Sequence, residues 1–184
     1  MGTERAGAEG VSPGRRRVRT HALRRASLSA GVLGAALVAG ACASSSGPAD
    51  CSSSGAVPLA ASGCIVYEDG GRLDAHRAQL TGLIEQGFEA SQRLLPMAGV
   101  RVRVFAQTRG VIPEIGIGGF SPSGDEVHLF VDPDSPRIPG SLEEELIPLL
   151  AHELHHTRRR RGPGYGATLL EAMVSEGLAD HYSM

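Results

Sequence analysis

The apolar positions in the middle of the chain follow two different periods. Apolar residues recur every three or four positions over residues 73–95, which predicts a long helix. Strict alternation over residues 100–105 and an apolar run over residues 126–131 predict two strands, and a short strand is expected at residues 64–67. Residues 107–125 show neither period and are expected to form a loop.

Two further helices are predicted in the last third of the chain. Ser141 followed by Glu144 matches a capping box and starts a helix, in which Pro148 is expected to cause a kink or a restart. Thr168 and Glu171 repeat the pattern and open a final helix that reaches His181. These elements predict an α+β fold, with a small mixed sheet packed against the long helix and the helix after Ser141.

The charge distribution separates an N-terminal head from the rest of the chain. The formal net charge is −2, but residues 42–184 hold eleven Arg against eighteen acidic residues, a formal charge of −7. This charge gives no support to nucleic-acid binding. Residues 1–41 combine a run of Arg with an apolar stretch that is too short to span a bilayer, which predicts a signal peptide.

The apolar stretch ends in Ala39-Gly40-Ala41-Cys42, which resembles a bacterial lipobox with Cys42 as the lipidated residue. The same residues suit an ordinary signal peptidase, and Arg24-Arg25 suits twin-arginine export. We therefore expect an exported protein, either a membrane-anchored lipoprotein on the outer face of the cell envelope or a secreted or periplasmic protein. Contact with the membrane is expected only through the lipid anchor.

Residues 42–63 are rich in Ser, Gly and Pro and predict a flexible tether, which leaves residues 64–184 as one folded domain. If Cys42 carries lipid, Cys51 and Cys64 remain as a pair that can close a short disulfide loop. Two free thiols in a flexible linker are an equally open alternative.

The motif H-E-x-x-H at residues 152–156 carries the most specific chemistry. In a helix, His152 and His156 project from one face and can hold a single Zn²⁺, while Glu153 can reach a water without ligating the metal. Such a site needs a third protein ligand and an open fourth position. Glu176, separated from His156 by nineteen residues, is the candidate ligand.

This spacing, together with Glu176-x-x-x-Asp180, resembles the gluzincin (thermolysin-like) pattern of zinc peptidases. Residues 169–180 look like a bacterial family of predicted zinc-dependent proteases, and the resemblance extends over residues 110–184. It implies a zincin-like domain with His152, His156 and Glu176 as zinc ligands, Glu153 as general base and Asp180 as outer support.

The resemblance also implies two features of the substrate cleft. Gluzincins usually add a Tyr or His that stabilises the oxyanion, and the nearby candidates are Tyr165, His181 and Tyr182. Zincin-type peptidases carry an edge strand that pairs with extended substrate, and residues 126–131 occupy the corresponding place in the sequence. An ordinary sheet strand at residues 126–131 is an equally open alternative. Residues 116–119 are expected to form a turn next to the cleft.

The ligand set predicts a zinc metalloendopeptidase that acts on peptides or proteins. Glu153 would take a proton from zinc-bound water as that water attacks a peptide carbonyl. The alternative is a zinc-binding module that binds extended peptides with little or no turnover. His155 is expected to lie outside the ligand set, and residues 158–161, all Arg, are expected to complement the dipole of the helix C-terminus.

Overall fold

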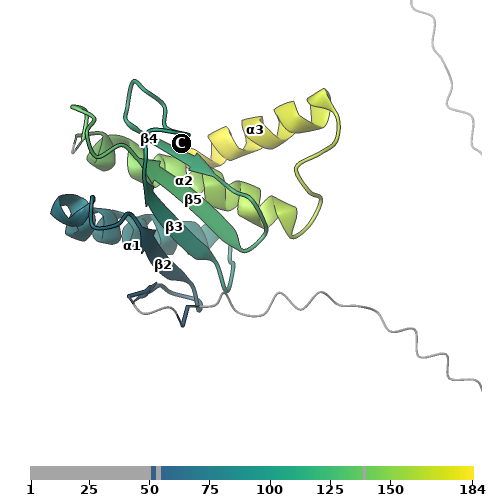
Figure 1. Cartoon of the computed structure of the whole chain (residues 1–184). Coiled ribbons are helices and arrows are strands. Elements are labelled where there is room, and N and C mark those ends of the chain that lie inside the picture. The colour runs from purple at the N-terminus through teal and green to yellow at the C-terminus, as the bar shows by residue number, and fades with distance from the viewer. Residues whose placement is uncertain (1–50, 53–54, 139) are drawn as a thin grey trace, which may run out of the picture. The chain divides into compact units, whose positions relative to one another are not determined.

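The computed structural model describes residues 51–52, 55–138 and 140–184. This part of the chain forms a sheet, three α-helices and one short 3₁₀ turn (Figure 1). In chain order the elements are β1 (Val57–Pro58), β2 (Cys64–Glu68), η1 (Asp74–His76), α1 (Arg77–Leu94), β3 (Arg101–Ala106), β4 (Ile117–Phe120), β5 (Glu126–Val131), α2 (Gly140–Arg160) and α3 (Leu169–Ser183).

The sheet is mixed and has the strand order β1-β2-β3-β5-β4. The three central strands β2, β3 and β5 are parallel, whereas β1 and β4 are antiparallel to their neighbours and form the two edges. The predicted α+β class with a small mixed sheet is therefore confirmed.

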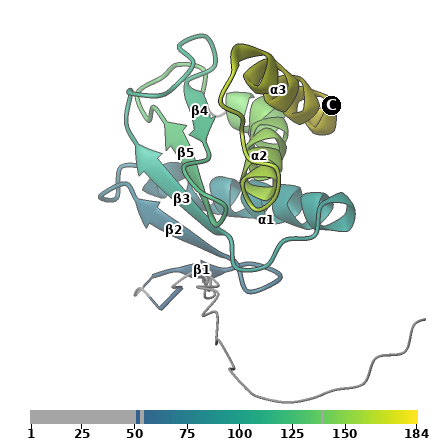
Figure 2. The same ribbon diagram turned by 90° about the vertical axis from the view of Figure 1, so that its right-hand side faces the viewer.

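Alternation along β3 and β5 decides which face of the sheet is covered. Val102 and Val104 of β3 are fully buried, as are Val127, Leu129 and Val131 of β5, while the residues between them are partly exposed. Figure 2 shows α1 and α2 on one side of the sheet, with α3 packed against α2. The buried side chains of the helices complete this core: Leu80, Ile84 and Phe88 of α1, and Leu142, Leu146, Leu150 and Leu154 of α2.

The edge strand differs from the prediction. Residues 126–131 do form a strand, but β5 lies inside the sheet between β3 and β4. The edge is β4, which arises from the segment predicted to be a loop and a turn. β4 has only four residues, two of them Gly118 and Gly119, so it lacks the side-chain alternation that identifies a strand.

The glycine at position 118 is required by a close backbone contact. A Cβ atom built on Gly118 would lie 2.0 Å from the carbonyl oxygen of Gly110, because the loop before β4 crosses the strand there. Glycine within a strand commonly marks such an approach of another backbone segment.

Helix α2 also differs from its prediction in two respects. It begins at Gly140, so Ser141 lies in the first turn and does not precede the helix as a cap. It continues through Pro148 to Arg160 as one helix, so the alternative of a restart at Pro148 is wrong, while a kink there stays a prediction. Proline removes one helical hydrogen bond, but the fully buried Leu146 and Leu150 on either side of Pro148 hold this segment against the core.

The folded part begins earlier than residue 64. Val57 and Pro58 of β1 pair with Ile65 and Cys64 of β2, inside the segment predicted to be a flexible tether. A disulfide joins Cys51 to Cys64, with a Cα–Cα distance of 5.9 Å, so the alternative of two free thiols is wrong for this structure.

The predicted signal peptide and the lipidation site Cys42 lie outside the described residues. Within the described part of the chain, none of the helices is both long enough and apolar enough to cross a membrane.

Breaking the disulfide should destabilise the fold, because the bond closes a loop with a sequence separation of 13 in the unfolded chain. Reduction should lower the free energy of unfolding by about 2–4 kcal/mol. Urea unfolding of the oxidised and reduced protein measures this difference. As a control, Cys51→Ser should unfold at the same urea concentration with or without reductant. Equal midpoints for oxidised and reduced parent protein would contradict the stabilising role.

Candidate metal centre

Helix α2 presents two imidazole rings on the side that faces α3. Leu150 and Leu154 point into the core, and His152 and His156, also four residues apart, occupy another face of the same helix. Their ring centroids lie 4.6 Å apart, and their Nε2 atoms lie 2.9 Å apart. His156 is buried and His152 is partly exposed.

Helix α3 brings a carboxylate to the same point. Its start is fixed by the predicted capping box, in which Thr168 Oγ1 accepts from the Glu171 amide and the Glu171 carboxylate accepts from the Thr168 amide. The buried residues of α3 are Ser175 and Ala179, whose small side chains permit a close approach to α2. Glu176 Oε2 consequently lies 3.2 Å from Nε2 of both His152 and His156.

The spacing of these three atoms is compatible with a shared metal ion. Ligands at about 2.0–2.1 Å from a tetrahedral Zn²⁺ are separated by about 3.3 Å, close to the 2.9, 3.2 and 3.2 Å found here. Two imidazoles and one carboxylate are also a ligand set that zinc enzymes use. Among the described residues, His152, His156 and Glu176 form the only cluster of this kind.

Further contacts orient two of the three donor side chains. Asp180, one turn after Glu176, places Oδ1 3.0 Å from Nδ1 of His152, which leaves Nε2 of that ring directed at the cluster. The Tyr165 hydroxyl donates to Glu176 Oε1. Burial raises the pKa of Glu176, but the hydrogen bond from Tyr165 and the two histidines outweigh this effect and lower the pKa below its ordinary value.

Glu153 lies beside this cluster and packs against β4 and the residue that follows it. Its side chain is buried, and Oε2 lies 2.9 Å from the Ser121 hydroxyl, which also lies 2.6 Å from the Glu153 carbonyl oxygen. The Thr157 hydroxyl donates to Ser121 at 3.2 Å and extends the network. Burial raises the pKa of the Glu153 carboxyl, and the hydrogen bond from Ser121 opposes this shift only in part.

Gly119 makes room for the Glu153 side chain. A Cβ atom at position 119 would lie 2.6 Å from Cγ of Glu153 and 2.9 Å from Oε1. Any larger residue would displace the carboxylate, so the glycine-rich sequence of β4 serves the site as well as the sheet.

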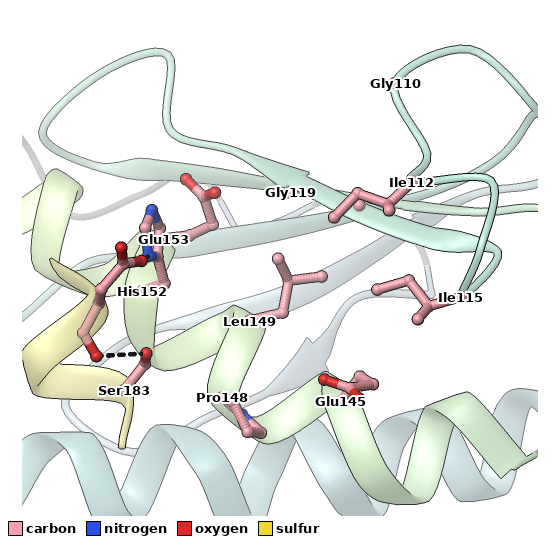
Figure 3. Close-up of a pocket in the computed structure, with 12 residues that line it drawn as sticks. Gly110, Ile112, Ile115, Gly119, Glu145, Pro148, Leu149, His152, Glu153 and Ser183 are labelled. Atoms are coloured by element: carbon pink, nitrogen blue, oxygen red, sulfur yellow. Dashed lines mark hydrogen bonds and ion pairs between the residues drawn. The ribbon is translucent and has the colours of Figure 1, made fainter. Parts of the chain in front are cut away.

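Two cavities flank His152 and Glu153 along β4. One, of about 440 Å³, contains the whole cluster together with Ser121, Tyr165 and Arg160. The other, of about 350 Å³, lies toward the first half of α2 and has apolar walls from Ile112, Ile115 and Leu149 (Figure 3). Because both cavities include Gly119, His152 and Glu153, they form two sides of one cleft centred on those residues.

The backbone of β4 is open toward this cleft at Gly119. Ile117 uses the outer edge of the strand, where its carbonyl accepts from the Ile112 amide at 2.9 Å, while the Gly116 carbonyl accepts from Asp132 on the β5 side. Backbone groups alternate between the two edges, so the N–H and C=O of Gly119 face the outer edge.

The three candidates for oxyanion stabilisation lie in different places. Tyr165 lines the larger cavity, but its hydroxyl donates to Glu176. The Tyr182 hydroxyl donates to the Ser91 carbonyl of α1 at 3.1 Å, and His181 is exposed. The structure therefore brings only Tyr165 to the cluster.

His155 lies outside the ligand cluster, as expected. Its ring packs on Tyr182 with centroids 5.8 Å apart. Burial lowers the pKa of His155, and the neighbouring His156 adds to that shift.

Ser121, Thr157 and Arg160 were not predicted as site residues, and Gly119 was predicted only as part of a turn next to the cleft. Thr157 and Arg160 carried a usable signal, because they follow Glu153 and His156 at four-residue steps on the same helix. Ser121 carried none, and no local pattern indicated that Gly119 contacts Glu153, since both roles depend on β4 lying beside α2.

Comparison with known proteins places these observations in a family. A search of curated proteins and of solved structures finds no match. A family model with the description "Predicted Zn-dependent protease (DUF2268)" matches residues 80–184, which include β4, α2 and α3 with every residue of the cluster. The match spans more than half of the chain, and the protein therefore belongs to this family of predicted zinc-dependent proteases.

Proposed function

We propose that the protein is a zinc metalloendopeptidase of the gluzincin type. The observation that carries the proposal is the convergence of Nε2 of His152, Nε2 of His156 and Oε2 of Glu176, with the Glu153 carboxylate beside them. Zn²⁺ held there would supply a Lewis acid that polarises a peptide carbonyl and lowers the pKa of water. The family assignment supports zinc dependence.

The proposed ligands keep a charge balance that suits catalysis. Two neutral imidazoles and one carboxylate leave a dication with a net positive charge and one open position for water or substrate. Asp180 would fix the tautomer of His152 through Nδ1 and raise the basicity of the nitrogen that faces the metal.

Glu153 is the proposed general base. Its carboxylate lies outside the ligand cluster, and Ser121 holds Oε2, so Oε1 is free to exchange a proton in the cleft. The carboxylate would take up a proton from water and return it to the leaving amine. Ser121 and Thr157 would keep the carboxylate in one orientation.

An extended peptide is the proposed substrate. It would pair with the N–H and C=O of Gly119 as an additional strand at the edge of β4. The cleft continues on both sides of His152 and Glu153, so a chain can extend in both directions from the scissile bond. This continuity supports an endopeptidase, since an exopeptidase needs one side of its cleft closed.

A second candidate function is a zinc-binding module that binds extended peptides with little turnover. The position of the Tyr165 hydroxyl favours it, because that group is bound to Glu176 and is not directed at substrate. Measurement of peptide hydrolysis by the zinc-loaded protein separates the two functions.

Export with a lipid anchor at Cys42 is our proposal for the location of the protein. The disulfide between Cys51 and Cys64 supports it, because such bonds persist in oxidising compartments outside the cytosol.

Zinc affinity should fall in a graded way when the two acidic residues of α3 are replaced. Glu176→Ala should nearly abolish zinc retention because it removes a ligand, and Asp180→Ala should weaken binding by about 10–100-fold. The exposed Glu144 provides a control, and Glu144→Ala should bind zinc like the parent. Calorimetric titration with Zn²⁺ measures all three. Unchanged affinity in both α3 variants, with stability shifts below about 0.5 kcal/mol, would mean that these are ordinary surface acids.

Glu153→Gln should separate metal binding from chemistry. The amide cannot accept a proton, so we expect zinc content equal to that of the parent and loss of essentially all hydrolysis of casein. Metal analysis and release of labelled peptides measure the two properties. Hydrolysis at the parent rate by this variant would exclude Glu153 as the base.

Labelled palmitate should enter the full-length protein in a bacterial host, and Cys42→Ser should block its incorporation. Gel fluorography of the two proteins is the measurement. Label that persists in the Cys42→Ser protein would rule out lipidation at this cysteine.

A further inference from the structure

Only one of the four consecutive arginines at the end of α2 lines the cleft. Arg160 follows His152 and His156 at four-residue steps, so the three side chains lie along one face of the helix. It lines the larger cavity with the ligand cluster, whereas its neighbours do not. Arg158 and Arg160 are both exposed and Arg159 is partly exposed, but only Arg160 borders this cavity, and Arg161 donates to the Gly124 carbonyl. A general role in balancing the helix dipole does not distinguish Arg160 from the other three.

The Arg160 guanidinium is a cation without a carboxylate partner in the described part of the chain. Its central carbon lies 5.8 Å from the centre of the Tyr165 ring, a cation–π contact that directs the side chain over the cavity. The two carboxylates of that cavity have other partners: Glu153 is bonded to Ser121, and Glu176 is bonded to Tyr165 and close to the histidines. The five donors of the guanidinium therefore remain available to an incoming group.

The formal charges indicate which kind of substrate group Arg160 would bind. A dication at the cluster would balance the charges of Glu153 and Glu176, which leaves Arg160 as a net charge of about +1 in the larger cavity. A guanidinium binds a carboxylate through two parallel hydrogen bonds, a geometry that few other substrate groups offer.

The smaller cavity, on the other side of Glu153, is lined mainly by apolar and acidic side chains and has no arginine among its described lining residues. Figure 3 shows Ile112, Ile115 and Leu149 around it, with Glu145 at the end away from His152. Its ionisable lining residues besides His152 are the acids Glu145, Glu153 and Asp180. A carboxylate of the substrate is therefore favoured on the Arg160 side of the scissile bond and disfavoured on the other side.

The direction of β4 determines which end of a bound peptide lies in each of the two cavities. β4 runs from Gly118, which lines the smaller cavity, to Phe120 and Ser121, which line the larger one. A peptide paired antiparallel to β4 runs in the opposite direction, so its amino-terminal part lies beside Arg160. The bridge between Ile112 and Ile117 at the same edge is already antiparallel.

We propose that Arg160 is a specificity-determining residue that binds the carboxylate of an Asp or Glu side chain on the amino side of the scissile bond, within two residues of it. The proposal rests on the proposed function, because it assumes that a peptide occupies the cleft along β4. It names the substrate class as peptides with an acidic residue just before the cleaved bond.

The test measures peptide binding by a variant that is expected to bind zinc but not to hydrolyse peptides. Zinc-loaded full-length Glu153→Gln is titrated with fluorescent peptides that differ from one another at a single position, which holds either Asp or Asn. The varied position is each of the three residues on either side of the bond that the parent protein cleaves. If the parent cleaves no bond, every position of the peptide is varied in turn. Each peptide is made with a free and an amidated C-terminus. We expect Asp to bind about tenfold more tightly than Asn at one or two neighbouring positions, on the amino side of any cleaved bond.

Three further substitutions on the Glu153→Gln background make the result specific to Arg160. Arg160→Gln should remove the preference for Asp, and Arg160→Glu should reverse it, so that Asn binds more tightly than Asp at the same position. Arg158→Gln removes an equal charge from an exposed position outside both cavities and should keep the preference.

The outcomes separate this inference from the proposed function. An Arg160-dependent preference for Asp in a protein whose parent form does not hydrolyse casein supports Arg160 as the residue that binds the carboxylate of the peptide and contradicts the peptidase proposal. Hydrolysis with equal affinity for Asp and Asn peptides contradicts the inference alone. A preference on the carboxyl side, a preference that follows the free C-terminus, or absence of peptide binding also overturns it.

Discussion

The contact between α2 and α3 is the constraint on which the site depends. His152 and His156 need only a regular helix to share a face, but the third donor lies on another helix twenty positions after His156. Ser175 and Ala179 bury small side chains against α2, and this close packing brings Glu176 within 3.2 Å of both rings. Asp180 is carried along on the same turn. A metal ion at this point would join two helices that otherwise meet through small residues, so metal binding and packing are expected to support each other.

The sheet supplies the other half of the site. Ser121, at the end of β4, contacts both the backbone and the carboxylate of Glu153, and Gly119 leaves the space that this carboxylate occupies. The same four-residue strand exposes its outer edge to the cleft. One short element therefore positions the proposed base and offers a backbone for substrate pairing, which explains why glycine stands at positions where a strand normally carries larger side chains.

Sequence reasoning predicted the features that depend on local periodicity. The helix after residue 73, the strands around residues 102 and 128, and the capping box at Thr168 follow from patterns within a few turns of chain. It failed where long-range contacts override local signals: β4 forms because β5 pairs with it, and α2 passes through Pro148 because its neighbours are buried. Spacing in the sequence predicted the grouping of His152, His156 and Glu176, and the structure brings these side chains together, whereas Ser121 depends on a contact across 32 positions that no local pattern encodes.

The most direct test of the account is the X-ray absorption spectrum of the zinc-loaded protein at the zinc K edge. The account predicts one site with two imidazole nitrogens at about 2.0–2.1 Å and oxygen ligands at about 2.0–2.2 Å from one carboxylate and one non-protein group. Replacement of His152 should remove one imidazole from the spectrum. A first shell with sulfur at about 2.3 Å, or one without two imidazoles, would contradict the proposed centre.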